Sequence, residues 1–176
     1  MVKSLEGVSH SVLLTGLVLI IVLVGTYYYY QSKQNNVALI DSKAHMPYIT
    51  DVIKETEQNT NFRKVLFTGT RSQLVVMSIS PGGEVGEETH TYTEQTLFFL
   101  SGSGKAILDG KESPIQAGSV VVVTPGTKHN FINTGTVALK LYTVYSPPNH
   151  MDGLIEATKA DADANVQDEE YGNQPK

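Results

Sequence analysis

Hydrophobic residues follow two different patterns along this chain, and the first is a long apolar run near the amino terminus. No Asp, Glu, Lys or Arg occurs between Glu6 and Lys33, and residues 12–24 are almost entirely aliphatic. As a helix, residues 12–30 would span about 28 Å, close to the hydrocarbon thickness of a bilayer. The tyrosines at 27–30 fall where aromatic side chains line a membrane interface. The run therefore predicts a transmembrane helix over residues 11–30.

A cleaved signal peptide is the main alternative for this run, and it would make the protein secreted. The strictly aliphatic part is short, which favours that alternative, but the basic residue ahead of it, Lys3, is offset by Glu6 and no small-x-small cleavage site follows. A buried core helix fits poorly, because the run is apolar on all sides. The sequence thus favours a single-pass signal anchor held in membrane lipid, with its orientation left open.

The second pattern begins near residue 61 and consists of short β-prone runs separated by glycine turns. Residues 63–67, 73–79, 97–100, 105–108, 119–123 and 138–145 are rich in β-branched and apolar types. Asp109-Gly110 is a strong signal for a two-residue hairpin. Short strands at roughly 8–12-residue spacing, without amphipathic helices between them, predict an all-β antiparallel sandwich or barrel.

Charge and composition add limits rather than a function. The formal net charge is −5, and the carboxyl-terminal residues 149–176 alone carry seven acids against two lysines. No basic stripe exists to bind nucleic acid, no cysteine is present to bind metal, and the acidic end beyond residue 164 is expected to be disordered. The expected organisation is a flank (1–10), a transmembrane helix (11–30), a linker and arm (31–60), the β-barrel (61–148) and an acidic tail (149–176).

Two histidines, His90 and His129, lie in the central stretch 81–133, one in each half of it. Each is set among turns and short β-prone runs, so the two halves are expected to face one another as strand pairs of one barrel. These are also the positions that carry a family resemblance. The first half matches a histidine motif at His90, Tyr92, Gln95 and Gly102, and the second half matches its companion at Gly118, Gly126, His129 and Asn133.

With both motifs in register, the chain resembles the cupin superfamily, and over about residues 61–164 it is similar to small single-domain cupins of the type-2, sugar-phosphate-isomerase-like group. The resemblance implies a jelly-roll fold, a double-stranded β-helix. It also implies a divalent metal ion (Fe, Mn, Zn or Ni) held inside the barrel. The positions carried over are His90, Tyr92, Gln95 and His129, where the family's stronger metal sites have three imidazoles and a carboxylate.

Two residues are candidates to supply the missing carboxylate. Glu88 lies two residues before His90 on a predicted strand, so the two side chains share a face. Glu94 is the other candidate, although it is adjacent to Gln95 and in or near a hairpin turn. Two function classes follow. One is an enzyme in which the metal polarises a small oxygenated substrate, as in an isomerase or a dioxygenase. The other is a non-catalytic module that binds a small sugar-like ligand, or that forms a homodimer, without metal.

Overall fold

The computed structural model describes residues 10–44 and 47–175, in two units that are considered separately. The first unit contains one helix, α1 (His10–Ala44). Among the side chains described for it, the apolar run at residues 17–24 covers about 12 Å of helix, and Thr26, four tyrosines and Gln31 follow. The flank predicted at 1–10 lies, up to residue 9, outside the described residues.

Among the residues whose side chains are described, 16–34 of α1 and 47–175, no helix is long and apolar enough to cross a bilayer. The membrane localisation predicted from residues 11–30 is therefore wrong. The prediction took the length of the apolar run from the sequence alone. Among the side chains described in α1, the apolar run covers only residues 17–24, which is shorter than the roughly 20 residues that a transmembrane helix needs.

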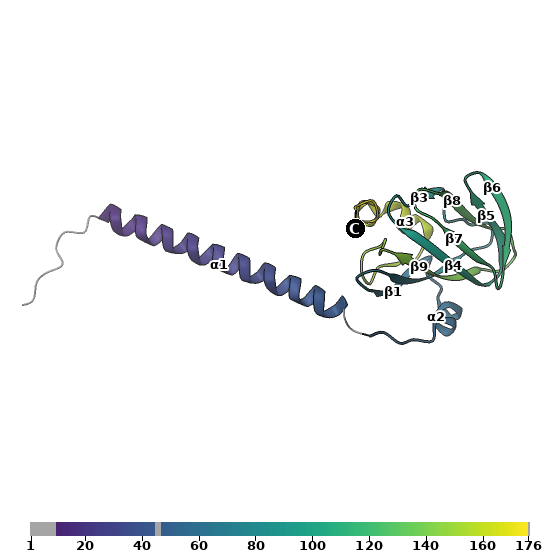
Figure 1. Ribbon diagram of the computed structural model, residues 1–176, viewed down its shortest axis with the longest axis horizontal. Helices are drawn as coiled ribbons and strands as arrows, with labels where there is room; N and C mark the ends of the chain where they lie inside the picture. The colour runs from purple at the N-terminus through teal and green to yellow at the C-terminus, as the bar shows by residue number, and fades with distance from the viewer. Residues whose placement is uncertain (1–9, 45–46, 176) are drawn as a thin grey trace, which may run out of the picture. The chain divides into compact units, whose positions relative to one another are not determined.

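Two antiparallel sheets form the second unit (Figure 1). The larger sheet has the strand order β10-β1-β2-β9-β4-β7 and the smaller one the order β3-β8-β5-β6. The strands are β1 (Arg63–Thr68), β2 (Gln73–Ile79), β3 (Glu88–Thr89), β4 (Glu94–Ser101), β5 (Ser103–Leu108), β6 (Lys111–Gln116), β7 (Val120–Val123), β8 (Lys128–Asn133), β9 (Leu139–Ser146) and β10 (Ile155–Glu156). The predicted jelly roll is present, but its two sheets do not close into one barrel.

The core lies between the two sheets because the strands alternate buried and partly exposed positions. In β9, at the centre of the larger sheet, Leu139, Leu141, Thr143 and Tyr145 are all buried. Successive side chains of a strand point to opposite faces, so these four lie on the inner face. The last of these four residues, Tyr145, lies next to His90, with the ring centroids 5.7 Å apart.

Gly104 in β5 marks a place where the neighbouring strand of the same sheet, β8, approaches too closely for a side chain. A Cβ atom there would lie 2.2 Å from the carbonyl oxygen of Ile132 on the neighbouring strand. We expect Gly104→Ala to lower the free energy of unfolding by about 1–3 kcal/mol, the usual cost of overpacking. Urea denaturation measures it, with the exposed neighbour Ser103→Ala as control; equal stability of the two variants would contradict the close approach.

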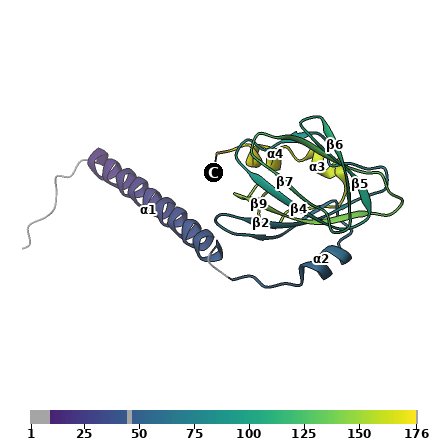
Figure 2. The same cartoon turned by 45° about the vertical axis from the view of Figure 1, so that its right-hand side comes forward.

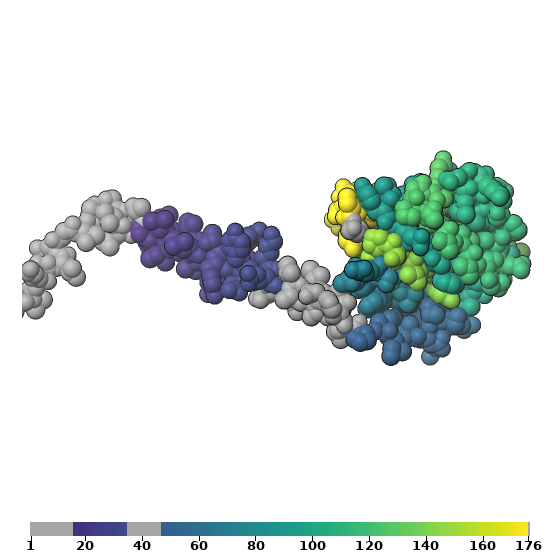
Figure 3. Space-filling model, in the orientation of Figure 1, coloured from purple at the N-terminus to yellow at the C-terminus, as the bar shows by residue number. Residues whose placement is uncertain are grey.

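The carboxyl-terminal segment is folded against the sheets. After β10 come two short helices, α3 (Lys159–Ala164) and α4 (Val166–Gly172), and in Figure 3 these last residues lie against the rest of the unit. A capping box between Thr158 and Asp161 begins α3, and Asn165 caps α4. The prediction of a disordered acidic end was wrong, because several of its polar side chains stabilise helix starts or are buried in ion pairs.

The predicted arm at 31–60 contains a further short helix, α2 (Val52–Gln58), which Asp51 caps. Figure 2 shows α2 on one side of the sheets and α3 and α4 on another. The two carboxyl-terminal helices therefore lie on a side of the sheets where they can cover a site between them, whereas α2 lies on another side.

Candidate metal centre

Three side chains with metal-binding atoms converge at the edge of the smaller sheet. Glu88 in β3 pairs directly with His129 in β8, and His90 follows Glu88 by two residues, on the same face. Glu88 Oε1 lies 3.5 Å from His90 Nε2 and 3.4 Å from His129 Nε2. One ligand atom from each of the three residues lies within 4.8 Å of those of the other two. The antiparallel pairing of two strands thus brings together residues that are about forty positions apart.

The imidazole of His129 has a fixed proton position. Its Nδ1 lies 2.9 Å from the carbonyl oxygen of Thr127, and a carbonyl can only accept, so Nδ1 carries the hydrogen. Nε2 then presents its lone pair. It is buried and has no hydrogen-bond partner among the described residues, which is the arrangement found in metal-binding histidines whose other nitrogen donates to a carbonyl.

The side-chain nitrogen Nδ2 of Asn149 lies 3.3 Å from Nδ1 of His90 and, in this orientation of the amide, donates to it. An amide can donate through its nitrogen or accept through its oxygen, so it can support either tautomer of the ring. The Nε2 atom of His90 is likewise buried without a hydrogen-bond partner in the described part of the chain. The two rings meet edge to face, with centroids 5.0 Å apart.

Glu88 is the negative centre of the group. Burial alone would raise its pKa, but contacts with His129 and His90 and the positive charge of Arg63 outweigh burial and hold the pKa well below its usual value. Burial lowers the pKa of His129, whereas Glu88 and the Thr127 carbonyl raise it, with a net upward shift. The carboxylate is therefore ionised and attracts a positive charge to this point.

Two imidazoles and one carboxylate suit a divalent transition-metal ion. Two buried nitrogen atoms without hydrogen-bond partners, beside an ionised carboxylate, are costly unless something positive binds between them. The residues present therefore fit a metal ion.

The other two predicted site residues have different surroundings. Gln95 in β4 is buried, and its Nε2 donates to the hydroxyl of Tyr145 at 2.9 Å, while its Oε1 has no partner among the described residues. Tyr92 lies between β3 and β4 and is 46% exposed. The structure thus brings Glu88, His90 and His129 together, places Gln95 against Tyr145, and leaves Tyr92 at the surface.

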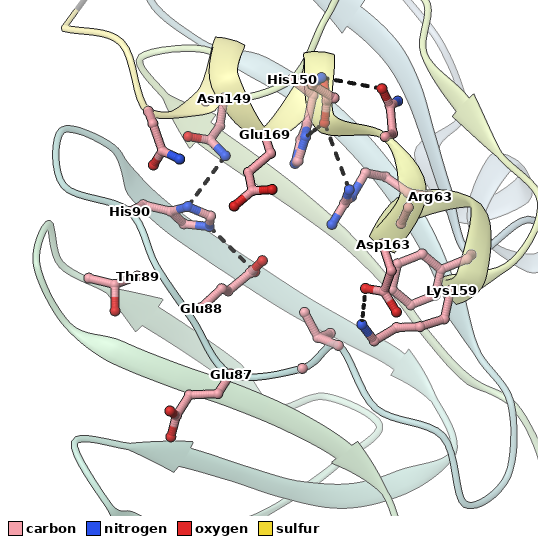
Figure 4. A pocket seen from close by; sticks show the side chains of 18 residues that line it. Arg63, Glu87, Glu88, Thr89, His90, Asn149, His150, Lys159, Asp163 and Glu169 are labelled. Atoms are coloured by element: carbon pink, nitrogen blue, oxygen red, sulfur yellow. Dashed lines mark hydrogen bonds and ion pairs between the residues drawn. The ribbon is translucent and has the colours of Figure 1, made fainter.

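A cavity of about 420 Å³ opens beside Glu88 and His90 (Figure 4). Its remaining walls come from β1 and from the carboxyl-terminal segment, including Arg63, Asn149, His150, Asp168 and Glu169. None of these five residues is among the site residues predicted from the sequence. The signal that could have shown them was the Asn149-His150 pair just after the last long strand.

Comparisons with known proteins agree with this fold. Residues 75–145 match the family described as the cupin domain. An uncharacterized protein of Bacillus subtilis, YrkC, is 36% identical over 138 residues, which cover 74% of each chain. The chain belongs to the cupin superfamily. A solved structure from Bacillus halodurans is 33% identical and has a TM-score of 0.67, covering 68% of this cupin and 96% of its own chain.

A third relative of this cupin carries a functional name. It is an oxalate-binding protein of Thermotoga maritima, 34% identical over 68 residues, which cover 39% of this chain and 56% of its own. The family is therefore established over most of the folded unit, whereas this functional name rests on a shorter match.

A buried ion-pair network forms part of the cavity wall of this cupin. Arg63 Nη1 contacts Glu156 Oε2 at 2.9 Å and Asp168 Oδ2 at 3.9 Å. His150 Nδ1 lies 2.6 Å from Asp168 Oδ2, and the backbone nitrogen of Met151 donates to the other oxygen of Asp168. The network fastens the carboxyl-terminal segment to β1.

Acid is expected to destabilise the fold through His150. Burial, and then the charge of Arg63, lower the pKa of His150 to about 4, whereas the unfolded residue titrates near its usual value of about 6.5. Between those values the unfolded state binds more protons, so stability falls as the pH falls. From pH 6.5 to 5 the loss is about 1.6 kcal/mol.

Urea denaturation of the metal-free protein across that range measures the effect, with His150→Phe as the comparison because it keeps an aromatic ring beside Tyr145. His129 does not contribute to this loss of stability. Its pKa is raised in the folded protein, so the stability that its protonation contributes is fully present below about pH 6.5. Asp168 adds none either, since its pKa is lowered from an already acidic value. The same pH dependence in both proteins would contradict the assignment to His150.

Proposed function

We propose that this cupin binds one divalent metal ion through Glu88, His90 and His129 and presents it to a small oxygenated ligand in the adjoining cavity. The observation that carries the proposal is the pair of buried Nε2 atoms, without hydrogen-bond partners among the described residues, beside an ionised carboxylate. A bound metal would act as a Lewis acid that polarises an oxygen atom of the ligand.

The chain's own groups prepare this site in three ways. Thr127 fixes the tautomer of His129 through its carbonyl, and Asn149 holds the ring of His90. Glu88 supplies the negative charge that offsets part of the charge of a divalent ion. The surrounding side chains keep both imidazoles away from bulk water, with His90 at 9% and His129 at 1% exposure, which strengthens electrostatic interactions at the centre.

Iron, manganese, zinc or nickel are the metals that this donor set supports best. For the ligand, the name of the Thermotoga maritima relative supports a small molecule with oxygen donors. The cavity volume of about 420 Å³ is within the range of small-molecule sites.

Metal analysis after equilibrium dialysis tests the proposal. The purified full chain is dialysed against Mn²⁺, Fe²⁺, Ni²⁺ or Zn²⁺, and we expect about one equivalent of at least one metal in the wild type and far less in His129→Ala. Tyr92→Phe is the matched control, because Tyr92 lies at the surface and its replacement leaves the three ligands in place. Metal well below one equivalent with every ion, or the same amount in His129→Ala, would overturn the proposal.

A further inference from the structure

The wall of the cavity formed by the carboxyl-terminal segment has a chemistry of its own. We define this C-terminal wall by His150 and Glu169, both of which line the cavity together with Asn149 (Figure 4). His150 is 4% exposed, and Glu169 is exposed. The two side chains come from the carboxyl-terminal segment, so they add polar groups to the cavity besides the three candidate metal ligands.

His150 offers a hydrogen-bond acceptor at this wall. Its Nδ1 lies 2.6 Å from the carboxylate of Asp168, which can only accept, so Nδ1 carries the hydrogen. The lone pair is then on Nε2, which is buried and has no hydrogen-bond partner among the described residues. A buried acceptor without a partner is costly, and a donor from a ligand would relieve that cost.

Glu169 adds a negative charge that no cation balances in the part of the chain that the structure describes. The two cationic side chains that line the cavity are already paired. Arg63 is flanked by the carboxylates of Glu156 and Asp168 at 2.9 and 3.9 Å, and Lys159 contacts Asp163. Although Arg63 Nε has no hydrogen-bond partner among the described residues, the charge of Arg63 is therefore matched before a ligand arrives.

We propose that the C-terminal wall is a ligand subsite for hydrogen-bond donors, so that the end of the ligand away from the metal carries hydroxyl or ammonium groups rather than a second carboxylate or a phosphate. A hydroxyl can donate to His150 Nε2 and to the carboxylate of Glu169. An anionic group there would meet a lone pair and a negative charge with no free cation beside it. The proposal rests on the proposed metal centre, which would hold the other end of the ligand.

Two four-carbon acids test this subsite, L-threonate and L-tartrate. Both have the same α-hydroxycarboxylate end for the metal, and they differ only at the far end, which is a CH₂OH group in threonate and a carboxylate in tartrate. Calorimetric titration of the metal-loaded protein is expected to show threonate binding at least about tenfold more tightly, the effect of one hydrogen bond to a charged group. Protein-bound metal is quantified after each titration, since both acids chelate metals in solution.

Two variants on α4 link the preference to the wall. Glu169→Gln removes the unbalanced charge and should bring the two affinities to within about threefold of one another. Glu170→Gln removes the same charge from the next residue, which does not line the cavity, and should leave the wild-type ratio unchanged. Equal or tighter binding of tartrate by the wild type, the same ratio in both variants, or no binding of either acid would overturn the subsite.

The failure of the subsite and the failure of the metal centre are distinguishable. If dialysis shows no bound metal, the metal centre is excluded, and the same titrations on the metal-free protein then test the wall, where a preference for threonate that Glu169→Gln removes supports it. If metal binds and the preference is absent, the subsite alone is wrong.

Discussion

Replacing Arg63 with methionine is expected to lower the free energy of unfolding by about 3–5 kcal/mol. The guanidinium lies between two carboxylates, Glu156 and Asp168, and all three side chains are at most 9% exposed. Removing the cation leaves the two acids close together with little solvent. The cost is the energy of burying unpaired charge, since breaking one side of a buried pair is far more costly than never having formed it.

Urea denaturation of Arg63→Met against Lys64→Met measures this effect. Lys64 is the next residue of the same strand, and its ion pair with Glu55 is exposed, at 35% and 37%, so its removal should cost at most about 1 kcal/mol. Adding Glu156→Gln to Arg63→Met should restore part of the lost stability, because one unpaired charge disappears. Equal losses in the two single variants would show that the network does not hold the carboxyl-terminal segment in place.

Glu88→Gln is expected to weaken metal binding by more than about a hundredfold. Changes to groups that only support a metal ligand cost about ten- to a hundredfold, and this variant removes both a ligand oxygen and the negative charge at the centre. Competition with a chromophoric chelator measures the affinity. Glu87→Gln is the matched control, because Glu87 pairs with Lys128 at the surface, at 63% and 57% exposure. Comparable affinities in the two variants would exclude Glu88 as a ligand.

The sequence supported the strands and the histidine pair because both depend on short-range patterns. Runs rich in β-branched and apolar residues, such as Gln73–Ile79, indicate a buried strand. Of the two histidines, His90 follows β3 directly and His129 lies in β8, and these two strands pair in the smaller sheet. Glu88 was accessible to the same reasoning, since a residue two positions before His90 on a strand shares its face. Pairing in the structure then placed it opposite His129.

The carboxyl-terminal part of the site could not be predicted in the same way. Arg63 and Glu156 are 93 positions apart, and no local pattern links them. Acidic residues are usually solvated, so a run of them indicates a flexible tail, whereas here Glu156 and Asp168 are buried by pairing with Arg63 and His150. Hydropathy similarly predicted a membrane span at residues 11–30 that the described helices do not support. That this chain forms a homodimer stays a prediction, because the structure contains a single chain.

Anomalous diffraction from crystals grown with Mn²⁺ tests the metal centre most directly. If Glu88, His90 and His129 bind the ion, we expect one strong peak within about 2.0–2.3 Å of Glu88 Oε1, His90 Nε2 and His129 Nε2. A wild-type crystal with no peak there, or with its peak at surface carboxylates away from the two histidines, would contradict it.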